Sequence, residues 1–112
     1  MIGQISIFEI LGTDDLDVDL NEITEEDMAN MVGRELGLTF TRNEFGEYSA
    51  KIKNLILTVS FSNYMIDDNR RFIAVGWHNK KTTAGGGGPR DSVREAVNWF
   101  HQKIEEELRW TI

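Results

Sequence analysis

The residues able to perform acid–base or nucleophilic chemistry are few and poorly grouped in this 112-residue sequence. Its two histidines, His78 and His101, lie outside any metal-ligand spacing such as H-E-x-x-H. No serine stands in the G-x-S-x-G pattern of a nucleophile elbow. The sequence contains no cysteine, which excludes thiolate chemistry and disulfides. The sequence therefore predicts a protein that is not an enzyme, with no catalytic residue, no metal site and no cofactor.

The densest group of carboxylates lies in residues 12–21, GTDDLDVDLN. Four acids match positions 1, 3, 5 and 12 of the calcium-binding EF-hand loop: Asp15, Asp17, Asp19 and Glu26. The resemblance fails at Leu20, because that position needs glycine for the sharp turn, and no helical pattern precedes the run. Residues 12–21 are therefore expected to form an acidic linker or solvated loop.

A glycine-rich segment, AGGGGPR at residues 84–90, precedes the last predicted helix. Backbone N–H groups that converge at a helix N-terminus can bind an anion, and Lys80, Lys81 and Arg90 would add positive charge. The phosphate-binding pattern G-x-x-x-x-G-K-[ST] is absent, and Asp91 stands where a phosphate would lie. The favoured interpretation is a flexible connector from the last strand to the helix.

A third motif lies near the N-terminus. The pentapeptide Gln4-Ile5-Ser6-Ile7-Phe8 resembles the peptide by which bacterial proteins dock onto the DNA polymerase sliding clamp, written Q-L-[S/D]-L-F. The resemblance implies that the Gln4 amide hydrogen-bonds at one subsite and that Ile7 and Phe8 fill an apolar cleft. It covers five residues, so it indicates a partner and not a fold. The competing interpretation is an ordinary edge strand in which Ile5 and Ile7 pack into the domain.

Charge is unevenly distributed along the chain. The formal net charge is −7, but residues 1–35 hold ten acidic residues and one basic residue, a charge of −9. Residues 36–112 hold eleven basic and nine acidic residues, a charge of +2. Such asymmetry concerns partners rather than fold. The candidate anion- or nucleic-acid-binding residues in the basic middle are Lys51, Lys53, Lys80, Lys81 and Arg90.

Helical and strand periodicities predict the elements that position these groups. Residues 2–11 are expected to be extended. A helix is expected near residues 24–36, with Thr24 as its N-cap and Gly37 in the left-handed position after its end. Residues 38–80 alternate with period two and predict four antiparallel strands joined by short turns. A second helix is expected near residues 92–108, begun by an S-x-x-E capping box of Ser92 and Glu95.

These elements predict an α+β domain: helix, four-stranded antiparallel meander, helix, with both helices packed on one face of the sheet. The expected core includes Val59, Phe61, Val75, Trp77, Val97 and Phe100. The expected organisation is an N-terminal extended segment and acidic linker over residues 1–21, followed by a single domain over residues 22–112. No stretch approaches the roughly 20 apolar residues of a membrane span, so a soluble cytoplasmic protein without a membrane partner is expected.

Two fainter resemblances concern the rest of the chain. Several short motifs are similar to those of small uncharacterised proteins of Gram-positive phages and integrative elements: Phe45-Gly46-Glu47-Tyr48, Ser60-Phe61-Ser62-Asn63-Tyr64, Gly76-Trp77 and Asp91-Ser92-Val93-Arg94-Glu95-Ala96. This implies a mobile-element setting, in which small acidic inhibitors of host machinery are frequent. The order of helix, strands and helix is also similar to that of the double-stranded RNA-binding domain, although the basic K-K-x-A-K helix start is missing.

The sequence thus predicts a small interaction protein that docks onto a host protein, with the sliding clamp as the suspected partner. Two alternatives stay open. One is a nucleic-acid-binding module that uses the basic residues and the glycine-rich loop. The other is an inhibitor of a host defence nuclease, similar to an anti-CRISPR protein. The sequence does not fix the oligomeric state.

Overall fold

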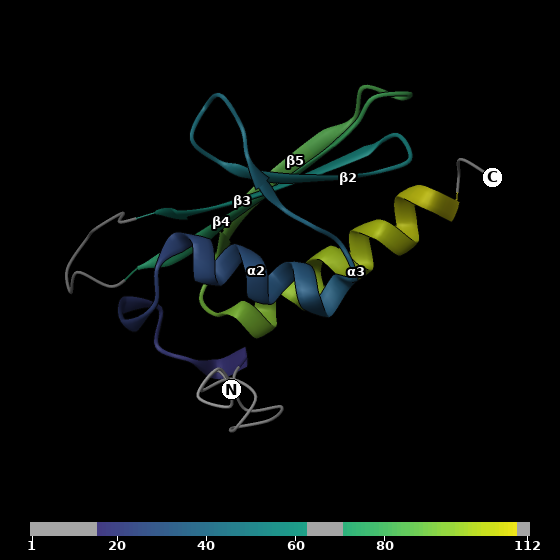
Figure 1. The fold of residues 1–112 in the computed structure, drawn as a ribbon. Coiled ribbons are helices and arrows are strands. Elements are labelled where there is room, and N and C mark those ends of the chain that lie inside the picture. Colours follow the sequence, from purple (N-terminus) through teal and green to yellow (C-terminus); the bar gives the residue numbers. More distant parts are fainter. Residues whose placement is uncertain (1–15, 63–70, 110–112) are drawn as a thin grey trace.

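Residues that alternate between apolar and polar side chains build an antiparallel sheet, on which two helices pack. The computed structural model describes residues 16–62 and 71–109. The elements follow the order η3 (Leu20–Glu22), α2 (Glu25–Leu36), β1 (Thr41–Arg42), β2 (Tyr48–Ile52), β3 (Leu55–Ser62), β4 (Phe72–Asn79), β5 (Gly85–Arg90) and α3 (Val93–Arg109). Neighbouring strands pair antiparallel in the order β1-β2-β3-β4-β5. Figure 1 shows α2 and α3 on the same side of the sheet. The predicted α+β class is confirmed.

The first helix begins and ends where local sequence signals place its boundaries. The Asp27 N–H donates to the Thr24 hydroxyl at 3.0 Å, and the Asp27 carboxylate accepts from the Thr24 N–H at 3.2 Å. This reciprocal capping box satisfies two backbone donors that a helix start leaves unpaired. At the other end, Gly37 has φ +71°, a left-handed conformation that glycine adopts without steric cost. The predicted helix near residues 24–36 is confirmed.

The second helix buries one apolar stripe against the sheet and α2. Val93, Ala96, Val97 and Phe100 are buried, and the Phe100 ring lies 6.1 Å from the Phe40 ring. The Ser92 hydroxyl accepts from the Glu95 N–H at 3.1 Å, as predicted. The Glu95 carboxylate, however, accepts from the Asp91 N–H and not from that of Ser92. Only the Ser92 half of the predicted capping box is therefore present.

The two faces of the sheet differ in composition. The side chains that face the helices are mostly apolar, and Leu55, Leu57, Val59, Ile73 and Val75 are buried there. Of the six predicted core residues, four are buried, while Phe61 and Trp77 are partly buried and pack against the core. Apart from Ile56, the opposite face carries small or polar residues at the alternate positions: Ser49, Lys51, Thr58, Ser60, Ala74, Gly76 and His78. No helix in the described part of the chain covers this open face (Figure 1).

The prediction of four strands is wrong, because the glycine-rich segment forms a fifth. Gly85–Arg90 pairs with β4 along its whole length, so it is not the expected flexible connector. Glycine and proline have low strand propensity, which hides such a strand from a sequence pattern. Close backbone approach explains one glycine: a Cβ at Gly87 would collide with the carbonyl oxygen of Val75. The first predicted strand is also shorter than expected, since only Thr41–Arg42 pairs.

The acidic segment before α2 is not solvated along its whole length. In its described part, Leu16 and Leu20 are buried members of the core. Asp19 is the N-cap of η3, and its carboxylate accepts from the Asn21 N–H at 2.9 Å. The expectation of a linker or solvated loop over residues 12–21 therefore does not hold at these two leucines. Among the described residues, no helix is both long and apolar enough to span a bilayer.

Candidate functional site

The five residues of the suspected clamp-binding peptide, Gln4, Ile5, Ser6, Ile7 and Phe8, lie outside the described residues. The same holds for the extended segment expected at residues 2–11. The candidate site that the structure does describe is the basic one, built at one end of the sheet.

Two turns meet at this end of the sheet and place three lysines there, beside a fourth on β2. The turn after β2 contains Lys53 and Asn54, and the turn after β4 contains Lys80 and Lys81. The Lys80 N–H donates to the Asn54 carbonyl at 2.8 Å, which joins the two turns directly. Lys51 lies at the same end of the sheet. It pairs with Ile56, Ile56 pairs with His78, and His78 pairs with Gly85, so these residues form one row across the four strands next to the turns. Both turns lie at the right of the sheet in Figure 1.

We call Lys51, Lys53, Lys80 and Lys81 the basic sheet end. All four lysines are exposed. No salt bridge is formed by any of them among the described residues, so their charges remain available to an anion. Separate exposed ammonium groups act as point charges, which suits a flexible or extended polyanion better than a single small ion.

Asn79 holds the second turn in place and was missed by the sequence reasoning. Its side chain is 1% exposed, and its carbonyl oxygen accepts from the N–H groups of Lys81 and Thr82. Its amide donates to the Glu107 carboxylate of α3 at 3.0 Å. Asn79 therefore fixes the backbone that carries Lys80 and Lys81 and ties it to a helix. The only local signal was the preference of asparagine for turns that its side chain caps.

Backbone strain accompanies this geometry. Lys53 has φ +58° and Thr83 has φ +63°, both left-handed conformations that non-glycine residues rarely adopt. Each belongs to one of the two turns that meet at the basic sheet end. Such conformations cost about 1–2 kcal/mol each. They persist here because the flanking strands and the Lys80–Asn54 hydrogen bond determine the turns.

The fifth predicted basic residue, Arg90, lies apart from the other four. It pairs with Ile73 at the end of β5 opposite to the turn with Lys80. Its guanidinium lies over the Trp99 ring of α3, 5.3 Å from the centroid, on the helical side of the sheet. The predicted set of five therefore separates into the basic sheet end and one distant arginine.

A shallow hollow of about 290 Å³ lies on the open face beside the basic sheet end. Its lining comprises Thr39, Thr41, Ser49, Ala50, Lys51 and Ile56. Hydroxyl groups and an ammonium group are donors that bind phosphate or carboxylate oxygens. The hollow therefore extends the anion-binding chemistry of the lysines toward β1.

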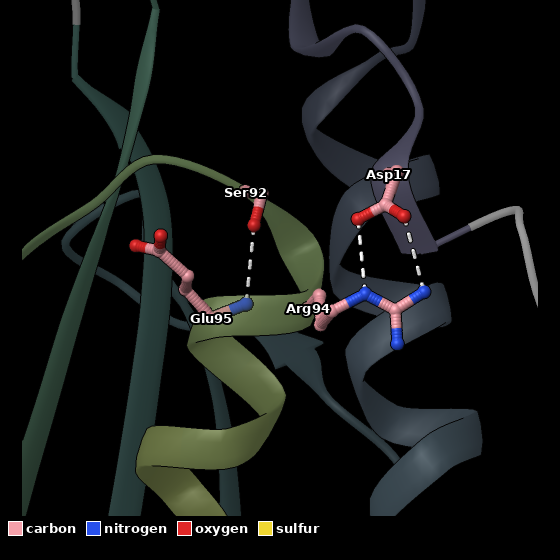
Figure 2. A network of polar contacts seen from close by, with 4 residues as sticks. All are labelled: Asp17, Ser92, Arg94 and Glu95. Carbon is pink, nitrogen blue, oxygen red and sulfur yellow. Dashed lines mark hydrogen bonds and ion pairs between the residues drawn. The ribbon is translucent and has the colours of Figure 1, made fainter.

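Outside the basic sheet end, an exposed ion pair links α3 to the segment before η3. Arg94 of α3 forms two hydrogen bonds with the Asp17 carboxylate, at 3.0 and 3.1 Å, as Figure 2 shows. These bonds lower the pKa of Asp17 below its ordinary value. His78 and His101 are both exposed, on different elements. Within the two described ranges, no three histidine or acidic side chains are grouped so as to hold a metal ion.

Comparison of the chain with protein-family models, with curated proteins and with solved structures gave no match.

Proposed function

We propose that this chain is a small, non-enzymatic interaction protein of a phage or mobile element, which docks onto the host DNA polymerase sliding clamp through residues 4–8. The observation that carries the proposal is the resemblance of residues 4–8 to the clamp-binding pattern: Gln4, Ser6 and Phe8 match it, and Ile5 and Ile7 stand for its two leucines. Seven residues separate this peptide from Leu16, the first described residue of the core. That spacing supports a peptide displayed apart from the folded domain.

The binding energy of so short a peptide must be concentrated in a few deeply inserted side chains. Phe8 and Ile7 are the apolar anchors, Gln4 sets the orientation through its amide, and Ser6 is a compact spacer. Truncation of Phe8 to alanine should weaken binding by about 2–3 kcal/mol, which is a loss of tens to hundreds of fold in affinity.

A calorimetric titration of the full-length protein into a purified bacterial sliding clamp tests the proposal. Phe8→Ala should lose affinity as stated and keep the unfolding free energy of the wild type. The matched control is Phe45→Ala, because Phe45 is 77% exposed in the described domain and offers the same change of side chain elsewhere. No interaction of the wild type with the clamp, or a several-kcal/mol loss of stability in Phe8→Ala, would support the edge-strand interpretation instead.

A second candidate function is binding of a nucleic-acid backbone at the basic sheet end. The hydrogen bond between Lys80 and Asn54 favours it, because it joins two turns whose lysines are distant in sequence. Phosphate contacts by these lysines would give a log–log salt dependence of affinity with a slope of about −0.7 to −0.9 per contact.

Electrophoretic mobility and fluorescence anisotropy with duplex and single-stranded DNA and RNA, over a salt series, test this function. The double variant Lys80→Gln and Lys81→Gln should weaken binding and flatten the salt slope. Arg42→Gln is the control. Arg42 is an exposed cation on β1 and pairs with Tyr48, the first residue of β2, whereas the basic sheet end lies at the last residues of β2. No shift for any nucleic acid at low salt would remove this candidate.

A further inference from the structure

The outer edge of β5 is a strand edge without a partner in the described part of the chain. β5 is the last strand in the sheet order and pairs only with β4. Its six residues span about 20 Å at the usual rise per residue of a strand. Four of them are glycines, so no side chain blocks the approach of another backbone along most of this length.

The hydrogen-bond pattern determines which groups of β5 face outward. The Asn79 N–H donates to the Ala84 carbonyl at 2.8 Å, so that pair is a hydrogen-bonded one. Hydrogen-bonded and non-hydrogen-bonded pairs alternate in an antiparallel ladder. The β5 residues that bond to β4 are therefore Gly86, Gly88 and Arg90, whose partners are Trp77, Val75 and Ile73. The residues whose backbone groups point away from the sheet are Gly85, Gly87 and Pro89.

The position of Pro89 fits this alternation. Proline has no N–H, and at an outward position no hydrogen bond to β4 is lost. The outer edge thus offers the N–H and carbonyl groups of Gly85 and Gly87, while the Pro89 carbonyl accepts from the Arg90 guanidinium at 2.6 Å. Proteins usually protect such an edge with charges, bulges or a covering segment. Along Gly85–Pro89 the only such protection that residues 16–62 and 71–109 supply is the proline itself.

The charges around the edge select the partner. From His78 to Arg90 the sequence has three cations and no acid, with Lys80 and Lys81 at the turn and Arg90 at the opposite end. On the helical side the Trp99 ring lies beneath Arg90, and the Lys103 ammonium lies 5.8 Å from the same ring. The acids nearby are Asp91, after the strand, and three glutamates of α3 that already have partners. Glu95 accepts from the Asp91 N–H, Glu106 is paired with Lys103, and Glu107 accepts from the Asn79 amide. An approaching strand therefore meets cations at both ends.

Pairing with a second copy is disfavoured by the same charges. Two β5 strands in antiparallel register would place Arg90 of one copy beside the turn of the other, where Lys80 and Lys81 lie. Like charges placed against each other oppose association. We propose that the β5 edge binds an extended acidic peptide of a partner protein by strand addition, through Gly85 and Gly87, with Lys80, Lys81 and Arg90 selecting its charge. The proposal uses other residues than 4–8 and goes beyond the proposed clamp docking.

Amide hydrogen exchange and fluorescence anisotropy of the full-length protein test the proposal, with a fluorescein-labelled peptide of four Glu-Val repeats as the probe. The peptide should bind saturably, and a Lys-Val peptide of the same length should bind at least about tenfold more weakly. At about 90% occupancy, exchange of the outward Gly85 and Gly87 amides should slow about tenfold. The Gly86 and Gly88 amides, already bonded to β4, should change little.

Charge-reversal variants provide the matched comparison. The double variant Lys80→Glu and Lys81→Glu should weaken Glu-Val binding by about tenfold or more, whereas Arg42→Glu should stay within about twofold, because Arg42 lies on β1, at the opposite edge of the sheet from β5. Lys80, Lys81 and Arg42 are exposed, so the variants should fold, and thermal melts check this. Binding without slower exchange at Gly85 and Gly87, or no binding of the Glu-Val peptide, would overturn the proposal. Protection of these amides by concentration-dependent self-association would do so as well, because it would assign the edge to a second copy.

Discussion

The covered and open faces of the same sheet have different physical roles. Adjacent residues of β3, such as Val59 and Ser60, point to opposite faces, and only Val59 is fully buried. The covered face packs aliphatic and aromatic side chains against α2 and α3, while the open face carries hydroxyls, glycine and lysine. The free energy of unfolding should therefore depend mainly on the covered face. Residues of the open face can be substituted with little loss of stability, so they are available for binding a partner.

The largest effect is expected at the centre of the covered side. Phe100→Ala removes a ring that has no exposed surface and that contacts the Phe40 and Trp99 rings. The free energy of unfolding should fall by about 3–5 kcal/mol because a cavity replaces the ring. Urea denaturation measures it, with the exposed Phe45→Ala as the control expected to stay within about 0.5 kcal/mol. Equal effects of the two changes would contradict the assigned face of α3.

The neighbouring pair on β3 tests the comparison directly. Val59→Ala should lower the free energy of unfolding by about 1.5–3 kcal/mol, because it removes buried methyl groups. Ser60→Ala should change it by less than about 0.5 kcal/mol, since the hydroxyl lies on the open face. The two variants are compared by the same urea melts. A Ser60 variant as destabilised as the Val59 variant would mean that something covers the open face.

Asn79 connects the covered side to the basic sheet end. Asn79→Ala leaves the Lys81 and Thr82 N–H groups and the Glu107 carboxylate without their partner, and should cost about 1–3 kcal/mol of stability. Asn98→Ala, an exposed change on α3, serves as the control. Hydrogen exchange at Lys81 and Thr82 should rise in the Asn79 variant. Unchanged exchange there would show that the turn holds its shape without this side chain.

The smallest effect is expected from the exposed ion pair between Asp17 and Arg94. Hydrogen bonds from Arg94 lower the folded-state pKa of Asp17, so the pair stabilises the fold above the unfolded-state pKa, near 4. This contribution is lost as the pH falls through the lower folded-state pKa. Asp17→Asn should therefore flatten the pH dependence of stability below about pH 4, and high salt should reduce the difference. Identical pH profiles of wild type and variant would exclude a stabilising pair.

Where a structural feature depends on neighbours in the chain, its position could be predicted from the sequence. Thr24 and Asp27 cap α2 because the partners lie within one turn, and Gly37 ends it because only glycine is unstrained at φ +71°. The alternation in residues 48–79 likewise predicted β2, β3 and β4, because successive side chains of a strand must point to opposite faces.

Tertiary structure decided the features that depend on residues distant in the chain. Gly85–Gly88 became a strand because β4 supplies its hydrogen bonds, which glycine propensity does not reveal. Leu16 and Leu20 belong to the core although their neighbours in the sequence are acidic, because burial removes their apolar side chains from water. The turns that contain Lys53 and Lys80 are neighbours, and Arg90 lies at the other end of β5. Strand register determines these positions, and the separation of the residues along the sequence does not reveal them.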